Sequence, residues 1–236
     1  MRYAIYFTPA PDAALWRLGS SVLGYDSRAG TAVAFPRHGL WSEPWFLRTQ
    51  ETPARYGFHA TLKAPFELAE GVGERALLER AAVFSSRCAP LCLPALEVAL
   101  IGDFVALRPL SEDAELNRMA AACVREFDDL RAPLGAEDRA RRLSQMLTPR
   151  QHAHLDRWGY PYIFEDFRFH MTLTGAIPKS FQARVLEALK ALHRPISAPV
   201  WVDAISVLVQ PKREGPFVLV ERFPLRATVP LVSLDR

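Results

Sequence analysis

Hydrophobic residues recur with different periods along the chain, and each period predicts a strand or a helix. Residues 2–8 are aromatic and β-branched, which is typical of a buried strand, and residues 13–23 carry apolar residues at helical spacing before Gly24. From residue 25 to residue 56 glycine and proline interrupt every period, which predicts a long irregular connection in which 41–47 is the one candidate helix. Long ordered loops of this kind often border binding sites.

Two later parts of the chain share one order of elements: a strand, a helix and two further strands. In the first part the helix is expected at 74–88 and the strands at 58–66, 91–101 and 104–110. In the second part the helix is expected at 179–193 and the strands at 167–174, 200–209 and 217–223. The repeated β-α-β-β order predicts an α+β fold built from two similar lobes.

The stretch between the two copies, residues 111–158, has the features of a helical insertion. Ser111 can cap a helix that runs to about residue 130, and another helix is expected to open at Thr148-Pro149-Arg150-Gln151. No linker rich in serine and glycine separates the parts. We therefore expect one bilobal domain over residues 1–236, with a first lobe over about 45–110 completed by elements from the termini, the insertion, and a second lobe over about 159–236.

Composition and charge narrow the class of protein. Half of the 236 residues are hydrophobic and 23% are charged, which is typical of a globular protein and excludes a disordered or collagen-like chain. The 29 lysine and arginine residues exceed the 26 aspartate and glutamate residues only slightly. This excess suits an anionic small molecule but is too small to predict a nucleic-acid partner.

The cysteines and the N-terminal sequence bear on the location of the protein. Cys88, Cys92 and Cys123 form no CxxC pair and have no histidine nearby, so they predict neither a disulfide framework nor a zinc site. The apolar run at residues 1–8 is too short for a signal peptide, and no stretch reaches the roughly 18 uncharged apolar residues of a membrane span. We expect a cytoplasmic protein that does not span a membrane.

A short sequence occurs in the first strand of each β-α-β-β copy. It reads Phe58-His59-Ala60-Thr61-Leu62 in the first copy and Phe169-His170-Met171-Thr172-Leu173 in the second. Five residues are a weak repeat alone, but both copies occupy the same place, directly before the helix of the unit. Position and residue type therefore agree in indicating a duplicated element.

Alternation along a strand divides each copy into an apolar face and a polar face. The polar face carries, along the two strands, His59, Thr61, Lys63, Arg168, His170, Thr172 and Thr174. A strand that merely faces solvent would carry varied polar residues, whereas here histidine recurs with a hydroxyl two residues later. We therefore expect both polar faces to border one cleft.

Two imidazoles and two hydroxyls that face one space suit chemistry on a phosphodiester. A neutral histidine can take a proton from the nucleophile, while a protonated histidine donates one to the leaving oxygen. Threonine hydroxyls can donate to the non-bridging oxygens, and Lys63 or Arg168 can offset the developing charge. The expected catalytic residues, which need no metal, are His59, Thr61, His170 and Thr172, although two histidines in a structural polar layer would give the same pattern.

Further residues are candidates for substrate contact. Tyr3 and Tyr6 lie on opposite faces of the first strand, so at most one of them faces the cleft, and Tyr6 is the candidate. Thr174 is a candidate by alternation. Lys212 and Arg213 precede the last strand and are candidates for binding a second phosphate, although a charged hairpin loop is the commoner meaning of such a pair.

Two other clusters carry no expected function. His152 and His154 would point about 200° apart on a helix, which suits surface positions better than metal chelation. The basic cluster Arg139, Arg141 and Arg142 is most simply a solvated helix face, with RNA contact as the alternative. Neither a metal nor a cofactor is expected.

The paired His-x-Thr-Leu tetrads resemble those of the two-histidine (2H) phosphoesterase superfamily, and both match without a departure. Beyond the tetrads, the chain is similar to the branch of this superfamily found in bacterial phosphonate-utilisation operons. The stretches that carry this similarity are Arg2-Tyr3-Ala4-Ile5-Tyr6, Leu23-Gly24-Tyr25-Asp26, residues 56–66 and residues 167–173. The resemblance covers nearly the whole chain.

The resemblance implies a bilobal 2H phosphoesterase fold, in which two pseudo-symmetric lobes with antiparallel sheets enclose a central cleft. Each lobe would contribute one histidine and one threonine, without a metal, and the partner would be a phosphorylated small molecule. For the branch, the resemblance implies a cyclic phosphate of the carbon–phosphorus lyase pathway. That compound would be 5-phosphoribosyl 1,2-cyclic phosphate, opened by water to a ribose bisphosphate.

Two alternatives to this enzyme stay open. Processing of RNA ends or of 2′,3′-cyclic nucleotides in the same fold would need a basic groove with aromatic side chains, which a net charge of +3 supports little. A non-catalytic module that binds sugar phosphates would keep the pocket without turnover. Intact histidine and threonine in both copies argue against such a module.

Overall fold

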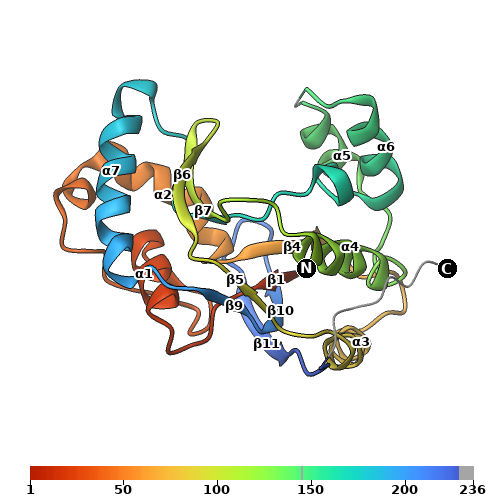
Figure 1. Cartoon of the computed structure of the whole chain (residues 1–236). Coiled ribbons are helices and arrows are strands. Elements are labelled where there is room, and N and C mark those ends of the chain that lie inside the picture. Colours follow the sequence, from red (N-terminus) through yellow and green to blue (C-terminus); the bar gives the residue numbers. More distant parts are fainter. Residues whose placement is uncertain (145, 229–236) are drawn as a thin grey trace.

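The computed structural model describes residues 1–144 and 146–228 and is built around a sheet of seven strands (Figure 1). Neighbouring strands are antiparallel throughout, in the order β11-β10-β1-β4-β8-β7-β6. These strands are β1 (Arg2–Phe7), β4 (Ala60–Phe66), β6 (Glu97–Ile101), β7 (Phe104–Arg108), β8 (Met171–Thr172), β10 (Ala204–Gln210) and β11 (Val218–Pro224). The expected α+β class with antiparallel strands is confirmed. Residues 229–236 of the expected domain lie outside the described residues.

Helices and short strands complete the described part of the chain. The helices are α1 (Ala14–Leu23), α2 (Pro44–Tyr56), α3 (Glu74–Arg87), α4 (Ala114–Glu126), α5 (Ala136–Leu143), α6 (Pro149–Trp158) and α7 (Gln182–His193). Short 3-10 helices are η1 (Gly39–Ser42), η2 (Phe164–Asp166), η3 (Lys179–Phe181) and η4 (Arg194–Ile196). Two small sheets pair β2 (Tyr25–Asp26) with β3 (Thr31–Ala32) and β5 (Leu91–Leu93) with β9 (Val200–Val202). Across the described ranges, every helix is too short or too polar to span a membrane.

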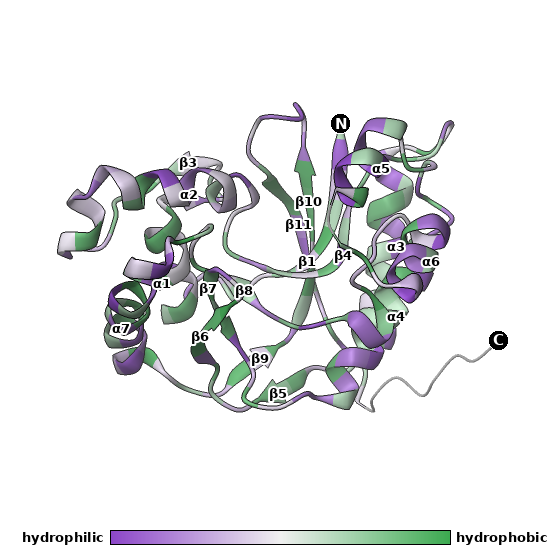
Figure 2. Ribbon diagram, turned by 90° about the horizontal axis from the view of Figure 1, so that it is seen from above, coloured by the Kyte–Doolittle hydropathy of each residue, from purple (hydrophilic) through white to green (hydrophobic). Residues whose placement is uncertain are grey.

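The central sheet has one face covered by helices and one face that stays open. On the covered face α3 and α4 pack against β4, β10 and β11, while α7 packs against β6 and β7, and the odd-numbered residues of β1 join this core. On the other face Ala4 and Tyr6 form a small cluster with Leu208 and Phe217. Figure 2 shows apolar residues concentrated on the strands and polar residues on the outer helices. The open face is where a site can form.

The two β-α-β-β copies are interleaved in the sheet. β6 and β7, from the first copy, lie beside β8, which carries the motif of the second copy. β10 and β11, from the second copy, lie with β1 beside β4, which carries the motif of the first copy. Strands from the expected lobes at about 45–110 and 159–236 thus alternate in one sheet: the β6–β7 hairpin pairs with β8, and the β10–β11 hairpin reaches β4 through β1.

The connection over residues 25–56 is more ordered than its proline and glycine content predicts. It contains β2, β3 and η1, and α2 replaces the short helix expected at 41–47. Pro44 occupies the first turn of α2, where proline is tolerated. Pro53 lies inside α2 and has no N–H, so the Thr49 carbonyl is free to accept a hydrogen bond from the Gly175 N–H at 2.8 Å. A long-range bond thus takes the place of a helical one.

Three expected strands are shorter than the pattern predicts. The stretch 91–101 is divided into β5 and β6, with Pro94 between them, because proline has no N–H for a sheet ladder. The stretch 200–209 is divided into β9 and β10 at Asp203, where the chain passes from one sheet to another. Of the stretch 167–174 only β8 pairs with its neighbours.

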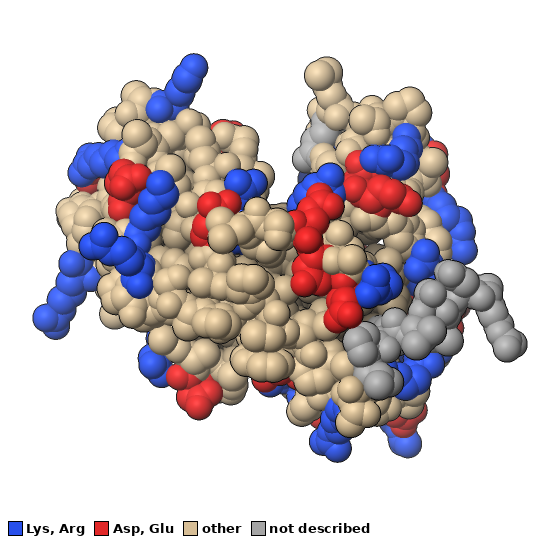
Figure 3. Space-filling view, viewed as in Figure 1, with Lys and Arg blue, Asp and Glu red and all other residues tan. Residues whose placement is uncertain are grey.

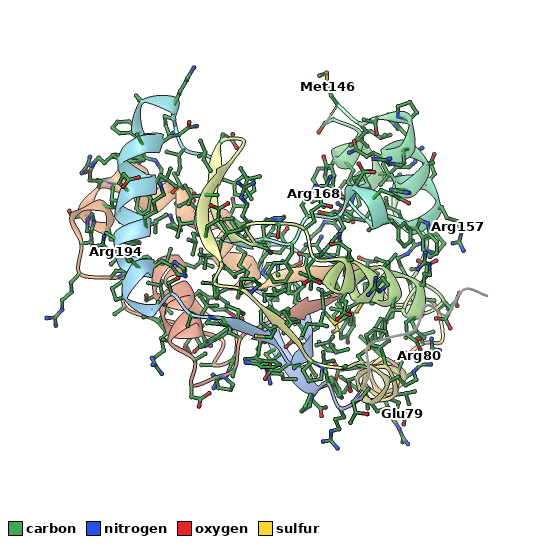
Figure 4. All side chains as sticks on the ribbon, in the orientation of Figure 1. Glu79, Arg80, Met146, Arg157, Arg168 and Arg194 are labelled. Carbon is green, nitrogen blue, oxygen red and sulfur yellow. The ribbon has the colours of Figure 1, made fainter. Side chains whose placement is uncertain are left out.

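The expected helical insertion divides into two parts. α4 belongs to the main core, since Leu116, Met119 and Cys123 on its apolar face are buried there. α5 and α6, residues 136–158, project from the sheet and are called the helical wall below. Figure 3 shows the molecule hollowed between this wall and the part that carries α7 and the β6–β7 hairpin. Met146 is fully exposed and lies at the outer end of the wall (Figure 4).

Candidate active site

The two motif strands, β4 and β8, are direct neighbours at the centre of the sheet. Ala60 pairs with Met171, and these are the central residues of the two motifs. In an antiparallel pair this register sets the histidine of each motif opposite the threonine of the other. Ala60 and Met171 are buried in the core, so by alternation the histidines and threonines belong to the open face. The duplicated motif is therefore related by a local two-fold axis between these two strands.

The register also brings the two histidines close to each other. His59 and His170 occupy diagonal positions of adjacent strands, which are separated by about 7–8 Å in antiparallel sheets. The charge of His170 contributes to lowering the pKa of His59, as expected for neighbouring rings. A single phosphate group can lie between side chains at this spacing.

Each histidine is held by the same local hydrogen bond. The His59 Nδ1 lies 2.9 Å from the Gly57 carbonyl oxygen, and the His170 Nδ1 lies 2.8 Å from the Arg168 carbonyl oxygen. A carbonyl oxygen only accepts, so each Nδ1 carries a hydrogen and each Nε2 keeps its lone pair when the ring is neutral. The Nε2 of His59 lies 3.2 Å from Thr61 Oγ1. Both rings thus use Nε2 for any proton transfer.

The residues that precede His59 fix the course of the chain. Gly57 ends α2 with a φ of +70°, and a Cβ at this position would lie 2.6 Å from the Ser27 side chain. Phe58 is fully buried, with its ring against Gly19 of α1. Because Phe58 is fixed in the core, the next side chain turns to the open face.

The two histidines differ in their surroundings. The His59 ring stacks on the Tyr6 ring with 3.7 Å between the centroids and 19° between the planes. Burial lowers the pKa of His59 to about 4, against the opposing effect of the Gly57 hydrogen bond. His170 instead lies beside Phe104, with 5.9 Å between the ring centroids. His59 is therefore neutral at physiological pH and can accept a proton.

A cavity of about 410 Å³ lies on the open face, between the sheet and the helical wall. Of the expected catalytic residues, His59, Thr61 and Thr172 line it, and His170 lies at its edge beside the lining residue Phe104. Tyr6 also lines the cavity, while Tyr3 points away and donates a hydrogen bond to Glu74 at 3.1 Å. The volume is in the range of small-molecule sites.

Lys63 does not face the cavity with His59 and Thr61. Thr61 pairs with Tyr6 of β1, and Lys63 pairs with Ile5, so β4 has one extra residue between them. This β-bulge moves Lys63 to the covered face, where its Nζ donates to the Val124 carbonyl at 2.9 Å and lies 3.5 Å from Asp128. Burial lowers the pKa of Lys63 to about 8. The alternation that predicted a substrate contact is broken by the bulge.

Arg168 and Thr174 have structural partners. Arg168 lies on the segment that returns from the helical wall to the sheet (Figure 4). Its guanidinium donates to the Glu165 and Phe167 carbonyls and lies 3.4 Å from the Glu112 carboxylate. Thr174 borders the cavity, but it is buried and its hydroxyl accepts the Val105 N–H at 3.0 Å. Both side chains are thus held by contacts within the protein.

Lys212 and Arg213 lie outside the cavity. Lys212 is exposed in the turn before β11, and its carbonyl accepts the Gly215 N–H. Arg213 forms ion pairs with Asp138 of α5 and Glu67, and it lines a separate cavity of about 220 Å³. Its contacts tie the helical wall to the β10–β11 hairpin.

Several cavity residues are absent from the candidates that the sequence analysis gave for the site. Arg142, which was expected on a solvated helix face, lines the cavity together with Tyr160, and its guanidinium lies over the Tyr160 ring. Arg2 of β1 and Tyr56 of α2 also line the cavity. Of these, Arg2 lies at the very start of β1, two residues before the even-numbered Ala4. Its alternation with Ala4 and Tyr6 is a usable signal.

Residues 1–144 and 146–228 contain no group of three or more histidine, cysteine, aspartate and glutamate side chains that could hold a metal ion. His152 is exposed, and the His154 Nδ1 lies 3.7 Å from Asp166. The surface position expected for the pair therefore holds for His152.

The sequence matches one protein family. Residues 61–218, about two thirds of the chain, match the family described as "Protein of unknown function (DUF1045)". The chain belongs to the DUF1045 family. The matched stretch includes Thr61 and the whole second motif, while His59 lies just before it.

Two curated relatives of this DUF1045 chain carry the same name, "Ribose 1,5-bisphosphate phosphokinase PhnN". The protein from Janthinobacterium sp. (strain Marseille) is 37% identical over 241 residues, which cover 97% of this chain and 53% of the relative. The protein from Laribacter hongkongensis (strain HLHK9) is 36% identical over 231 residues, which cover 93% of this chain and 50% of the relative. The chain thus spans about half the length of the curated relatives it matches.

Solved structures give weaker similarities to this DUF1045 chain. TT0787 of Thermus thermophilus has a TM-score of 0.46 and 16% identity, with 97% of this chain and 100% of that chain covered. Usb1 of Kluyveromyces marxianus has a TM-score of 0.39 and 13% identity, with 95% and 98% covered. TM-scores and sequence identities this low establish no shared function.

Proposed function

We propose that this DUF1045 protein is a phosphodiesterase of the 2H type that opens a cyclic phosphate without a metal. The observation that carries the proposal is the pairing of Ala60 with Met171, which makes the two motif strands neighbours. From this register we infer that two Nε2 atoms and two threonine hydroxyls converge on one point of the open face. A phosphodiester at that point meets a base, an acid and hydrogen-bond donors.

The two histidines take different roles in the proposed reaction. His59, which is neutral at physiological pH, accepts a proton from water as the water oxygen attacks phosphorus. His170 donates its proton to the sugar oxygen as the bond from phosphorus to that oxygen breaks. The hydroxyls of Thr61 and Thr172 donate hydrogen bonds to the non-bridging oxygens. One water molecule is consumed, and a phosphomonoester is formed.

The names of the relatives support a ribose phosphate as substrate. They name ribose 1,5-bisphosphate, and the chain matches only about half of each relative. This chain contains no Gly-x-x-x-x-Gly-Lys sequence of the P-loop type, so we assign the kinase activity of the relatives to their other half. Our proposed substrate is 5-phosphoribosyl 1,2-cyclic phosphate. Cleavage between phosphorus and O2 would yield ribose 1,5-bisphosphate, the compound that those names contain.

A nucleoside 2′,3′-cyclic phosphate is the second candidate substrate. Tyr56 and Phe104 line the cavity and offer aromatic faces on which a base can stack. Both candidates require the same two histidines, so they differ only in what lies beyond the cyclic phosphate.

Phosphorus NMR of the purified protein with each candidate substrate tests the proposal. We expect 5-phosphoribosyl 1,2-cyclic phosphate to be converted to ribose 1,5-bisphosphate in the presence of EDTA. Because acid–base catalysis contributes about 10²–10⁴-fold, His59→Gln and His170→Gln should each lower kcat by that factor. Unchanged turnover in either variant would remove that histidine from the mechanism. Activity that EDTA abolishes and zinc restores would contradict catalysis without a metal.

A further inference from the structure

The described side chains that line the cavity carry more positive than negative charge. Arg2, Arg141 and Arg142 line it, and no aspartate or glutamate is among its lining residues in the described ranges. Arg141 is paired outside the cavity with Asp138. Within the same ranges neither Arg2 nor Arg142 forms a direct ion pair with a carboxylate. Asp138 acts on both at longer range, but it is already paired with Arg141 and Arg213, so one carboxylate faces four arginines.

Arg142 has free hydrogen-bonding capacity inside the cavity. Its Nε is buried and has no hydrogen-bond partner among the described residues. Its guanidinium lies over the Tyr160 ring at 4.6 Å from the centroid, and Tyr160 also lines the cavity. Burial lowers the pKa of this guanidinium. A guanidinium fixed against an aromatic ring with N–H groups to spare is suited to phosphate recognition.

Arg2 is a second buried cation near the same place. Its Nε donates to the side-chain oxygen of Gln210 at 2.8 Å, a neutral partner that adds no negative charge. The charges of both Arg2 and Arg142 act on the hydroxyl of Tyr6, whose pKa burial raises well above 10. The Tyr6 ring stacks on His59. Arg2 and Arg142 therefore line the same cavity as Tyr6 and His59 of the proposed reaction centre.

We propose that Arg142 and Arg2, with Tyr160, form a second anion subsite that binds a phosphomonoester group carried by the substrate beside its cyclic phosphate. This inference rests on the proposed function and narrows its substrate class. A cyclic phosphodiester has a single negative charge, whereas a phosphomonoester adds about −1.5 to −2 and so matches the two unpaired guanidiniums. A nucleoside 2′,3′-cyclic phosphate has no such group, so the subsite favours the bis-phosphorylated sugar.

Two substrates that differ only in this group test the subsite. For ribose 1,2-cyclic phosphate with and without a 5-phosphate, the ratio of kcat/KM values should fall by about 10- to 100-fold in Arg142→Gln, since charged hydrogen bonds contribute about 1.5–3 kcal/mol. Arg142→Lys should recover part of the ratio. Arg139→Gln is the matched control, because Arg139 lies on the same helix and pairs with Asp156. An equal loss on both substrates, or no loss, would overturn the subsite.

Binding of ribose 5-phosphate separates this subsite from the catalytic proposal. Calorimetry should give an affinity at least tenfold weaker for Arg142→Gln than for the wild type and Arg139→Gln. If the wild type hydrolyses neither cyclic phosphate, the proposed function fails, and this affinity difference still decides the subsite. Equal affinities would overturn the subsite even where turnover holds. Should circular dichroism show that Arg142→Gln is unfolded, Arg142→Lys decides by the same two measurements.

Discussion

The two histidines of the motif strands have one backbone arrangement and two environments. Each Nδ1 donates to the carbonyl of the residue two positions earlier, so both rings are oriented by the same local geometry. Only His59 is stacked on a tyrosine, and its pKa is lowered to about 4 mainly by burial. A symmetric motif thus gains an asymmetry that acid–base catalysis requires, because one ring must be neutral when the other is protonated.

Replacement of Tyr6 should therefore change the titration of His59. In Tyr6→Leu the imidazole loses its stacking partner and becomes more hydrated, so its pKa should rise from about 4 toward 6.5. The acid limb of the kcat/KM profile should move to higher pH by the same amount. Nitrogen-15 NMR titration of the histidines measures the shift, with Tyr3→Leu, on the opposite face of β1, as the control. A His59 pKa that stays near 4 would show that Tyr6 does not set it.

The second motif strand is positioned by a helix far away in the sequence. Pro53 leaves the Thr49 carbonyl of α2 without its helical donor, and the Gly175 N–H takes that place just after β8. A Cβ on Gly175 would lie 2.5 Å from the Thr49 oxygen, so no larger residue fits there without a shift. The link fixes the chain that leaves β8 against α2, which also supplies Tyr56 to the cavity.

Gly175→Ala should consequently destabilise the protein. Forcing a methyl group into this contact is expected to cost about 1–3 kcal/mol, as for overpacking in a core, and to lower kcat because β8 must move. Urea unfolding measures the loss. Gly39→Ala is the control, since a Cβ there meets nothing within 4 Å, and its effect should stay within about 0.5 kcal/mol. Equal stability of the two variants would mean that the Thr49 contact does not position β8.

At the level of the complete molecule, the cavity is closed by parts that are distant in sequence. The sheet supplies the two motifs, and the helical wall supplies Arg142 from the opposite side. The ion pair between Arg213 and Asp138 ties this wall to the β10–β11 hairpin. The chain as a whole has a net charge of only +3, but positive charge is concentrated at this cavity, where Arg2, Arg141 and Arg142 lie.

This local charge should make catalysis sensitive to salt. For the 5-phosphorylated cyclic phosphate, kcat/KM is expected to fall by on the order of tenfold between about 0.02 M and 0.5 M NaCl, because salt screens the attraction between the cavity and an anionic substrate. The decrease should appear in KM and leave kcat nearly constant. Steady-state kinetics at several salt concentrations measure it, with Arg142→Gln showing a shallower dependence. A salt-independent KM would contradict an electrostatic role for the cavity.

Local patterns in the sequence predict much of this molecule. Strand 2–8, helix 13–23 and the helix in residues 74–88 follow from the spacing of apolar residues, and the structure has them within a few residues. Residue type and position identify the two motifs, and alternation places Tyr3 and Tyr6 on opposite faces of the first strand. These features depend on neighbours within a few positions, which is the range over which a sequence pattern acts.

Other features depend on contacts between distant parts of the chain. The interleaving of the two copies, the bulge that turns Lys63 into the core and the approach of Arg142 to the cavity are set by strand register and by the docking of the helical wall. The local pattern around Pro53 predicts an interruption, whereas α2 continues through it, because the partner that uses the free Thr49 carbonyl lies more than a hundred residues away. Register and docking arise from the packing of many side chains at once, so no short stretch of sequence contains them.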